Sequence, residues 1–137
     1  MNHLDIVIPA QPDEIPKVTA DIEEILRSQD FSPEAILDVQ LALEEVLVNI
    51  INYGYRGRAG NIAICCDASP SQVSLEISDS GPAFNPLSMP EPDVTSGIDE
   101  RRVGGLGIYL VRQVMDTVTY HHKNHKNILR LVKVKRE

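Results

Sequence analysis

Long apolar runs are missing from this chain of 137 residues, and so is the beginning typical of a secreted protein. No stretch of about 18 apolar residues occurs, so no transmembrane helix is expected. The first residues, MNHLDIVIPAQPDE, lack a basic segment followed by an apolar one, so we expect no secretory signal. The length predicts a single domain over residues 1–137, with the cytoplasm as its expected location.

Cysteines are few, and cationic residues are outnumbered by acidic ones. Cys65 and Cys66 are adjacent, and in a strand they would point to opposite faces, so no disulfide is expected between them. The net charge of -7 argues against general nucleic-acid binding. Basic residues do gather in the segment 123–136, which is typical of a solvated edge strand blunted by lysine.

Hydrophobic periodicity predicts a chain that alternates between strands and helices. The expected strands are 3–9, 61–67, 73–78, 117–122 and 128–135, and the expected helices are 13–28, 33–53 and 108–115. Ser32 is the expected N-cap of the second helix and Gly54 its expected C-cap. Hairpin connections are expected at 68–72 and 123–127. This order predicts an α+β fold, a two-layer sandwich of a mostly antiparallel mixed sheet with its helices on one face.

The expected second helix is apolar over most of its circumference but carries one polar line. Asp38, Ala42, Glu45, Asn49 and Asn52 follow one another by steps of three and four. The line is either a solvent-facing stripe or part of a site. It contains no lysine or arginine, although long cationic side chains are common on exposed helix faces. A carboxylate and an amide one turn apart can hold an activated water and a magnesium ion, which prefers oxygen ligands.

Two glycine segments lie outside the regular elements. In ISDSGPAF, Asp79 ends a strand, either as a turn residue or as an acceptor for an exocyclic amine such as that of adenine. Gly81 would let the backbone approach such a ring closely. In GGLGIYLV, the residues from Gly104 to Gly107 open a helix, either for packing or as a phosphate cradle of backbone N–H groups. Neither segment matches a dinucleotide fingerprint or a P-loop.

Together, EEVLVNIINYGY, SDSGPAF and GGLGIYLV resemble, in order and spacing, the three boxes of the gyrase, heat-shock chaperone, histidine-kinase and mismatch-repair ATPases. The chain is most similar to the small single-domain branch of this superfamily, the bacterial anti-sigma-factor serine-protein kinases. The resemblance covers nearly the whole chain and implies a Bergerat, or histidine-kinase-like ATPase, fold that binds ATP and Mg²⁺. The segment 84–103 would then be the ATP lid.

The resemblance also implies a role for each matching residue. Glu45 would be the general base, and Asn49 would hold Mg²⁺ between the ATP phosphates. Asp79 would bind the adenine amine, with Gly81 bordering the base. The expected phosphate-binding residues are Gly104, Gly105, Leu106 and Gly107. Arg101 and Arg102 would lie either in solvent or within reach of the γ-phosphate.

The activity that the resemblance implies is transfer of the γ-phosphoryl group of ATP to a serine of an anti-anti-sigma protein. The unphosphorylated partner would compete with a sigma factor for the kinase, which would be a homodimer. Two other functions remain open. The chain could be a nucleotide-responsive binding module that holds a partner without transferring phosphate, or it could hydrolyse ATP slowly with water.

Overall fold

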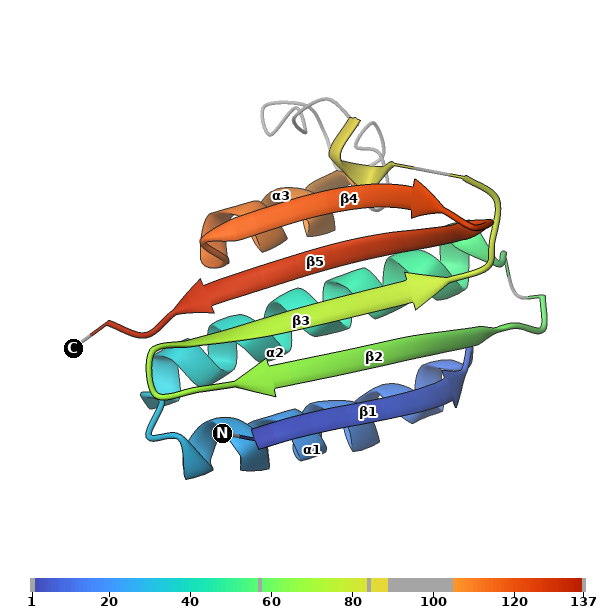
Figure 1. The fold of residues 1–137 in the computed structure, drawn as a ribbon. Helices are drawn as coiled ribbons and strands as arrows, with labels where there is room; N and C mark the ends of the chain where they lie inside the picture. Colours follow the sequence, from blue (N-terminus) through green and yellow to red (C-terminus); the bar gives the residue numbers. More distant parts are fainter. Residues whose placement is uncertain (1, 57, 84, 89–104, 137) are drawn as a thin grey trace.

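The computed structural model describes residues 2–56, 58–83, 85–88 and 105–136. Five strands form one sheet, and three α-helices cover one of its faces (Figure 1). The strands are β1 Asn2–Pro9, β2 Asn61–Ala68, β3 Gln72–Asp79, β4 Thr117–Lys123 and β5 Lys126–Val134. The helices are α1 Ile15–Ser28, α2 Pro33–Asn49 and α3 Gly105–Val114, with short helical turns at Pro12–Glu14, Ile50–Gly54 and Pro86–Ser88.

The sheet has the strand order β1-β2-β3-β5-β4, and each of the four adjoining pairs is antiparallel. The predicted α+β sandwich is therefore confirmed. A mixed sheet was expected, but no parallel pair occurs among the described strands. Hairpins join β2 to β3 and β4 to β5, two helices lie between β1 and β2, and β3 pairs with β5 and not with β4. Figure 1 shows α1 behind β1, α2 behind the centre of the sheet and α3 behind β4.

The core lies between the helices and the alternate residues of each strand that face them. In β2, Ile62, Ile64 and Cys66 are buried, while the residues between them are half-buried on the open face of the sheet. The two cysteines therefore point to opposite faces, as expected, and both are free thiols. Within the described residues, no helix is long and apolar enough to cross a membrane.

The second helix begins where its sequence predicts but ends differently. The Ser32 hydroxyl accepts a hydrogen bond from the Ala35 N–H at 3.1 Å, which confirms the N-cap. The α-helix ends at Asn49, and residues Ile50–Gly54 form a π turn in which the Tyr55 N–H reaches the Ile50 carbonyl at 2.8 Å. The prediction of a continuous α-helix to residue 53, capped by Gly54, is therefore wrong. The last turn is a π turn, which contains one more residue than an α-helical turn.

The last hairpin is tighter than expected, and its position in the sheet differs. Asn124 and His125 both have positive φ, 54° and 61°, which is the two-residue type I′ turn that the twist of a hairpin favours. The strands therefore extend into the expected five-residue connection 123–127. The basic segment was expected to be an edge strand, but β5 lies between β3 and β4. Lys133 is only 13% exposed, and its Nζ lies 3.1 Å from the Asp38 carboxylate.

Two leucines of α2 offer a test of which face of this helix holds the fold together. Leu43 is fully buried against the sheet, whereas Leu37 is 65% exposed on the opposite side. We expect Leu43→Ala to lower the free energy of unfolding by about 2–5 kcal/mol, because it leaves a cavity in the core. Leu37→Ala should change it by no more than about 0.5 kcal/mol.

Urea denaturation of the two variants, followed by circular dichroism, measures both values. Equal losses in the two variants would mean that α2 packs through a different face.

Candidate functional site: a pocket between two helices and the sheet

A pocket opens between the end of α2 and the sheet. Its floor and walls are mostly apolar, formed by Val46, Ile50, Ile77, Ile108 and Leu129. Four polar residues also line it. Asn49 lies at the end of α2, Asp79 at the end of β3, and Tyr120 and Asn127 on the β4–β5 hairpin. Apolar walls with a few convergent polar groups are typical of a small-molecule site.

Asp79 is the last residue of β3 and is 7% exposed. Its Oδ1 accepts hydrogen bonds from the Gly81 N–H at 2.9 Å and from Asn127 Nδ2 at 3.0 Å. Within the described residues, both of these bonds end on Oδ1, so Oδ2 is available to accept a hydrogen bond from a ligand. A buried carboxylate needs such partners, because charge without hydrogen bonds is costly inside a protein.

Asn127 holds the turn after β3 in place, a role that no sequence motif indicates. Its Nδ2 also donates to the carbonyl groups of Gly81, at 3.3 Å, and Pro82, at 3.0 Å. The Tyr120 hydroxyl donates to its Oδ1 and thereby fixes the orientation of the amide. Asn127 faces Asp79 directly across the β3–β5 ladder. This cross-strand pairing, which only the register reveals, is what orients the carboxylate.

Tyr55 fastens the end of the π turn to the sheet. Its hydroxyl accepts from the Ser80 N–H at 2.9 Å and donates to the Asn61 carbonyl at 2.7 Å. A Cβ atom on Gly60 would lie 2.4 Å from Tyr55 Cε1, closer than real contacts allow, so any other residue there would have to displace the ring. The tyrosine therefore joins the end of α2, the start of β2 and the end of β3 beside the pocket.

Gly81 lies in a narrow space between two parts of the site. An added Cβ would meet Asp79 Oδ1 at 3.1 Å and the Gly54 carbonyl oxygen at 3.4 Å. The π turn thus brings the end of α2 almost into contact with the turn that follows β3. The resemblance implies that Gly81 borders a bound base; in the structure Gly54, Asp79 and Pro82 around it line the pocket.

Glu45 lies against the first turn of α3. A Cβ on Gly107 would overlap the Glu45 carboxylate and would lie 3.3 Å from its Cδ atom. Gly107 is buried, and the sequence LGIYL continues directly into the helix. The positive end of the α3 dipole stabilises a carboxylate at this point. Glu45 and the glycine segment, which are about 60 residues apart in sequence, are therefore neighbours in space.

Glycines 105 and 107 belong to the helix itself, since α3 begins at Gly105 and not at Ile108 as expected. The first backbone N–H groups of an α-helix have no partner within the helix and can bind an anion. Leu106 also lies in this first turn. Gly104, Arg101, Arg102 and most of the expected lid at 84–103 lie outside the described residues. Of that segment, the short turn Pro86–Ser88 is described, and Pro86 borders the pocket.

Asn49 is half-buried and borders the pocket one turn after Glu45. The spacing of four residues places the two side chains on the same side of α2, as expected. The structure thus brings Glu45 to the start of α3, with Asn49 next to it in the pocket and Asp79 at the far wall. An amide oxygen at this place suits a hard cation that takes its other ligands from phosphate and water.

Comparison with known proteins agrees with this geometry. Residues 8–133 match the family of histidine kinase-like ATPase domains. Curated relatives named serine-protein kinase RsbW include one from Bacillus cereus (strain AH820), 24% identical over 98% of this chain and 86% of the relative. Another, from Bacillus thuringiensis (strain Al Hakam), is 22% identical over the same shares.

A solved structure has the same fold. The crystal structure of the RsbU and RsbW domains of Rv1364c from Mycobacterium tuberculosis superimposes with a TM-score of 0.67 at 16% identity. The match covers 100% of this chain and 34% of that longer one. The fold is that of a histidine kinase-like ATPase domain. The chain belongs to the histidine kinase-like ATPase domain family, and its similarity to the RsbW serine-protein kinases runs along nearly its full length.

The contact between Glu45 and Gly107 can be tested by a double-mutant cycle. An alanine inside a helix is normally favoured over glycine by about 1 kcal/mol. We expect Gly107→Ala to destabilise the wild-type chain, because the new methyl group overlaps the Glu45 carboxylate. In a Glu45→Ala background the same substitution should be neutral or stabilising, since the overlapping atoms are gone.

The free energies of unfolding of the four proteins, from urea titrations, give the coupling between the two positions. A Gly107→Ala effect that is the same in both backgrounds would mean that the two residues do not touch.

Proposed function

We propose that this chain binds ATP in the pocket between α2, α3 and the sheet, and that it is a protein-serine kinase. The observation that carries the proposal is the contact of Glu45 with the first turn of α3. That contact puts a candidate base next to backbone N–H groups suited to phosphate. The next residue of α3, Ile108, borders the pocket that Asp79 also lines. The RsbW relatives, which carry the name serine-protein kinase, support the same activity.

In this proposal each residue of the pocket has a defined task. The free Oδ2 of Asp79 accepts a hydrogen bond from the exocyclic amine of adenine, while Ile50, Ile77 and Leu129 pack against the ring. The first turn of α3, including Gly105 and Gly107, faces the phosphates. Asn49 would hold Mg²⁺, which neutralises phosphate charge when it is bound.

The reaction transfers the γ-phosphoryl group to a serine hydroxyl of a small anti-anti-sigma protein. The serine oxygen forms the new bond to phosphorus, and the bond between the γ-phosphorus and the oxygen that bridges it to the β-phosphate breaks, leaving ADP. Glu45 accepts the proton of the serine hydroxyl. We further propose that the protein acts in the cytoplasm as a homodimer and that it sequesters a sigma factor when the antagonist is phosphorylated.

Substitution of the proposed base separates catalysis from binding. We expect Glu45→Gln to lower the rate of phosphoryl transfer roughly 10²–10⁴-fold, the usual contribution of a general base. The affinity for Mg²⁺ and ATP should stay close to that of the wild type, because the shape of the side chain is kept. Glu44→Gln, the same change at the exposed neighbouring position, should alter neither quantity.

Labelled ATP, incubated with and without a candidate anti-anti-sigma protein, shows which species receives the phosphate. Binding of ATP with no labelled partner would favour the nucleotide-responsive binding module. Release of free phosphate alone would favour slow hydrolysis. Loss of ATP binding and of transfer to the same extent in Glu45→Gln would make Glu45 a structural residue.

Asp79 is the residue on which recognition of the base depends. In Asp79→Asn, the amide oxygen can keep the hydrogen bonds from the Gly81 N–H and Asn127 Nδ2. The amide NH₂ group would then face the amine of adenine, and two donors cannot bond to each other. We expect ATP affinity to fall by about 1.5–3 kcal/mol, the usual value of a hydrogen bond to a charged group. That corresponds to roughly 10–150-fold in dissociation constant.

Calorimetry with ATP and Mg²⁺ measures this loss. Asp30→Asn is the matched control, since Asp30 is exposed and has a φ of 60°, which asparagine tolerates well. Unchanged affinity in Asp79→Asn would remove Asp79 from the site.

A further inference from the structure

Four side chains with metal-binding atoms meet on the open face of the sheet, on the side opposite the helices. His3 and Asp5 come from β1, and Cys65 and Asp67 come from β2. The antiparallel register places His3 directly opposite Asp67 and Asp5 directly opposite Cys65. Residues two apart in a strand share a face, so the four side chains form the corners of one small rectangle.

Three of these side chains are close enough together to share one metal ion. A ring nitrogen of His3, the Cys65 sulfur and a carboxylate oxygen of Asp67 all lie within 4.8 Å of one another. His3 Nδ1 lies 2.5 Å from Asp67 Oδ1, and His3 Nε2 lies 2.7 Å from Asp5 Oδ2. Ligand atoms of a tetrahedral zinc site lie about 2.0–2.3 Å from the ion, so they are separated from one another by roughly 3.3–3.8 Å. An ion bound by His3, Cys65 and Asp67 would replace the hydrogen bond between His3 and Asp67, and Asp5 would keep its contact with His3 Nε2.

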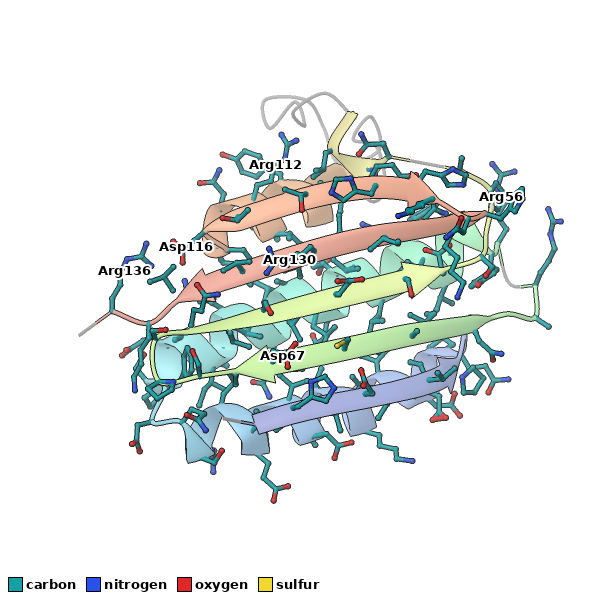
Figure 2. The ribbon with its side chains drawn as sticks, viewed as in Figure 1. Arg56, Asp67, Arg112, Asp116, Arg130 and Arg136 are labelled. Atoms are coloured by element: carbon teal, nitrogen blue, oxygen red, sulfur yellow. The ribbon has the colours of Figure 1, made fainter. Side chains whose placement is uncertain are left out.

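The chemistry of the four groups selects among metal ions. A thiolate and an imidazole favour zinc and similar transition metals, whereas magnesium prefers oxygen ligands alone. Negative charge at the cluster adds to the attraction, because Glu76 faces Cys65 across the β2–β3 ladder. Figure 2 shows Asp67 on β2, and Arg130 on β5 further across the same sheet. Glu76 and Arg130 are directly opposite each other in the β3–β5 register.

We propose that His3, Cys65 and Asp67 form a binding site for a divalent transition-metal ion, with zinc as the best match, and that Asp5 holds the other ring nitrogen of His3. The site clamps the edge strand β1 onto β2. It is separate from the nucleotide pocket, because Cys65 and Asp67 point to the open face while Ile62, Ile64 and Cys66 of the same strand point to the helices. Its occupancy therefore does not depend on whether the chain binds ATP.

Without a metal, hydrogen bonds to the carboxylates of Asp5 and Asp67 favour the protonated forms of His3 and Cys65. Asp5 and then Asp67 raise the pKa of His3 to about 9, and desolvation followed by the hydrogen bond to Asp5 raises the pKa of Cys65 to about 11. Metal binding must displace both protons, since imidazole nitrogen and thiolate sulfur are the ligands. The cluster thus has two states, one bridged by protons and one bridged by a metal ion.

Titration of the untagged, reduced full-length chain with Co²⁺ in the absence of nucleotide tests the site. We expect one equivalent of Co²⁺ to produce a thiolate-to-cobalt charge-transfer band, and one equivalent of Zn²⁺ to abolish it. Cys65→Ala should eliminate this band. Asp67→Asn should weaken metal binding at least about tenfold, because even a residue that only orients a metal ligand contributes about that much to affinity. Cys66→Ala, which removes the neighbouring thiol on the buried face, should keep the band.

Thermal unfolding gives a second readout that does not depend on cobalt spectroscopy. The melting temperature of the wild-type chain and of Cys66→Ala should rise with Zn²⁺ concentration, while that of Cys65→Ala should not. Excess Mg²⁺ should not displace the transition metal, and Asn49→Ala should bind it normally. A band that survives Cys65→Ala, or that disappears with His122→Gln on β4, would overturn the proposal, as would the absence of any thiolate band.

Discussion

The contact between the Glu45 carboxylate and Gly107 is the constraint on which the pocket depends. It fixes the start of α3 against the middle of α2, because a side chain of any size at position 107 would fill the space of the carboxylate. With that distance set, Ile108 becomes a wall of the pocket and Asn49 borders it one turn further along α2. The half-buried Glu45 carboxylate and the N-terminus of α3 are thereby held together, and the helix dipole favours a carboxylate at this position.

The other end of the pocket is built from hydrogen bonds. Asp79 is nearly buried, and its charge is tolerable there because Asn127 and the Gly81 N–H both donate to it. Tyr120 in turn orients Asn127, and Tyr55 holds the backbone of the next residue, Ser80. Such a connected network leaves one carboxylate oxygen with a fixed direction and little freedom, which is what recognition of a flat, hydrogen-bonding ring requires.

Much of the fold could be predicted from local sequence, and the site only in part. The N-cap at Ser32, the position of Asp79 at a strand end and the opposite orientation of the two cysteines follow from short-range rules, and the structure has all three. The role of Asn127 could not be predicted, because it follows from the register between β3 and β5, which is set by tertiary pairing. For the same reason, the basic segment was assigned to an edge although β5 is an interior strand. The steric reason for Gly107 was equally hidden, since it lies in a residue about 60 positions away.

The π turn at residues 50–54 has a consequence for how this chain can vary in length. An α-helix turns by about 100° for each residue, so one residue added to its ladder rotates everything beyond it by that angle. The inserted residue is what turns the Tyr55 ring toward the sheet and leaves Asn52 exposed, out of line with Asn49. Between Asn49 and Tyr55, the number of residues therefore matters as much as their identity. A chain shortened by one position there would regain a regular helix but would turn the Tyr55 hydroxyl away from the Asn61 carbonyl and the Ser80 N–H that it now joins.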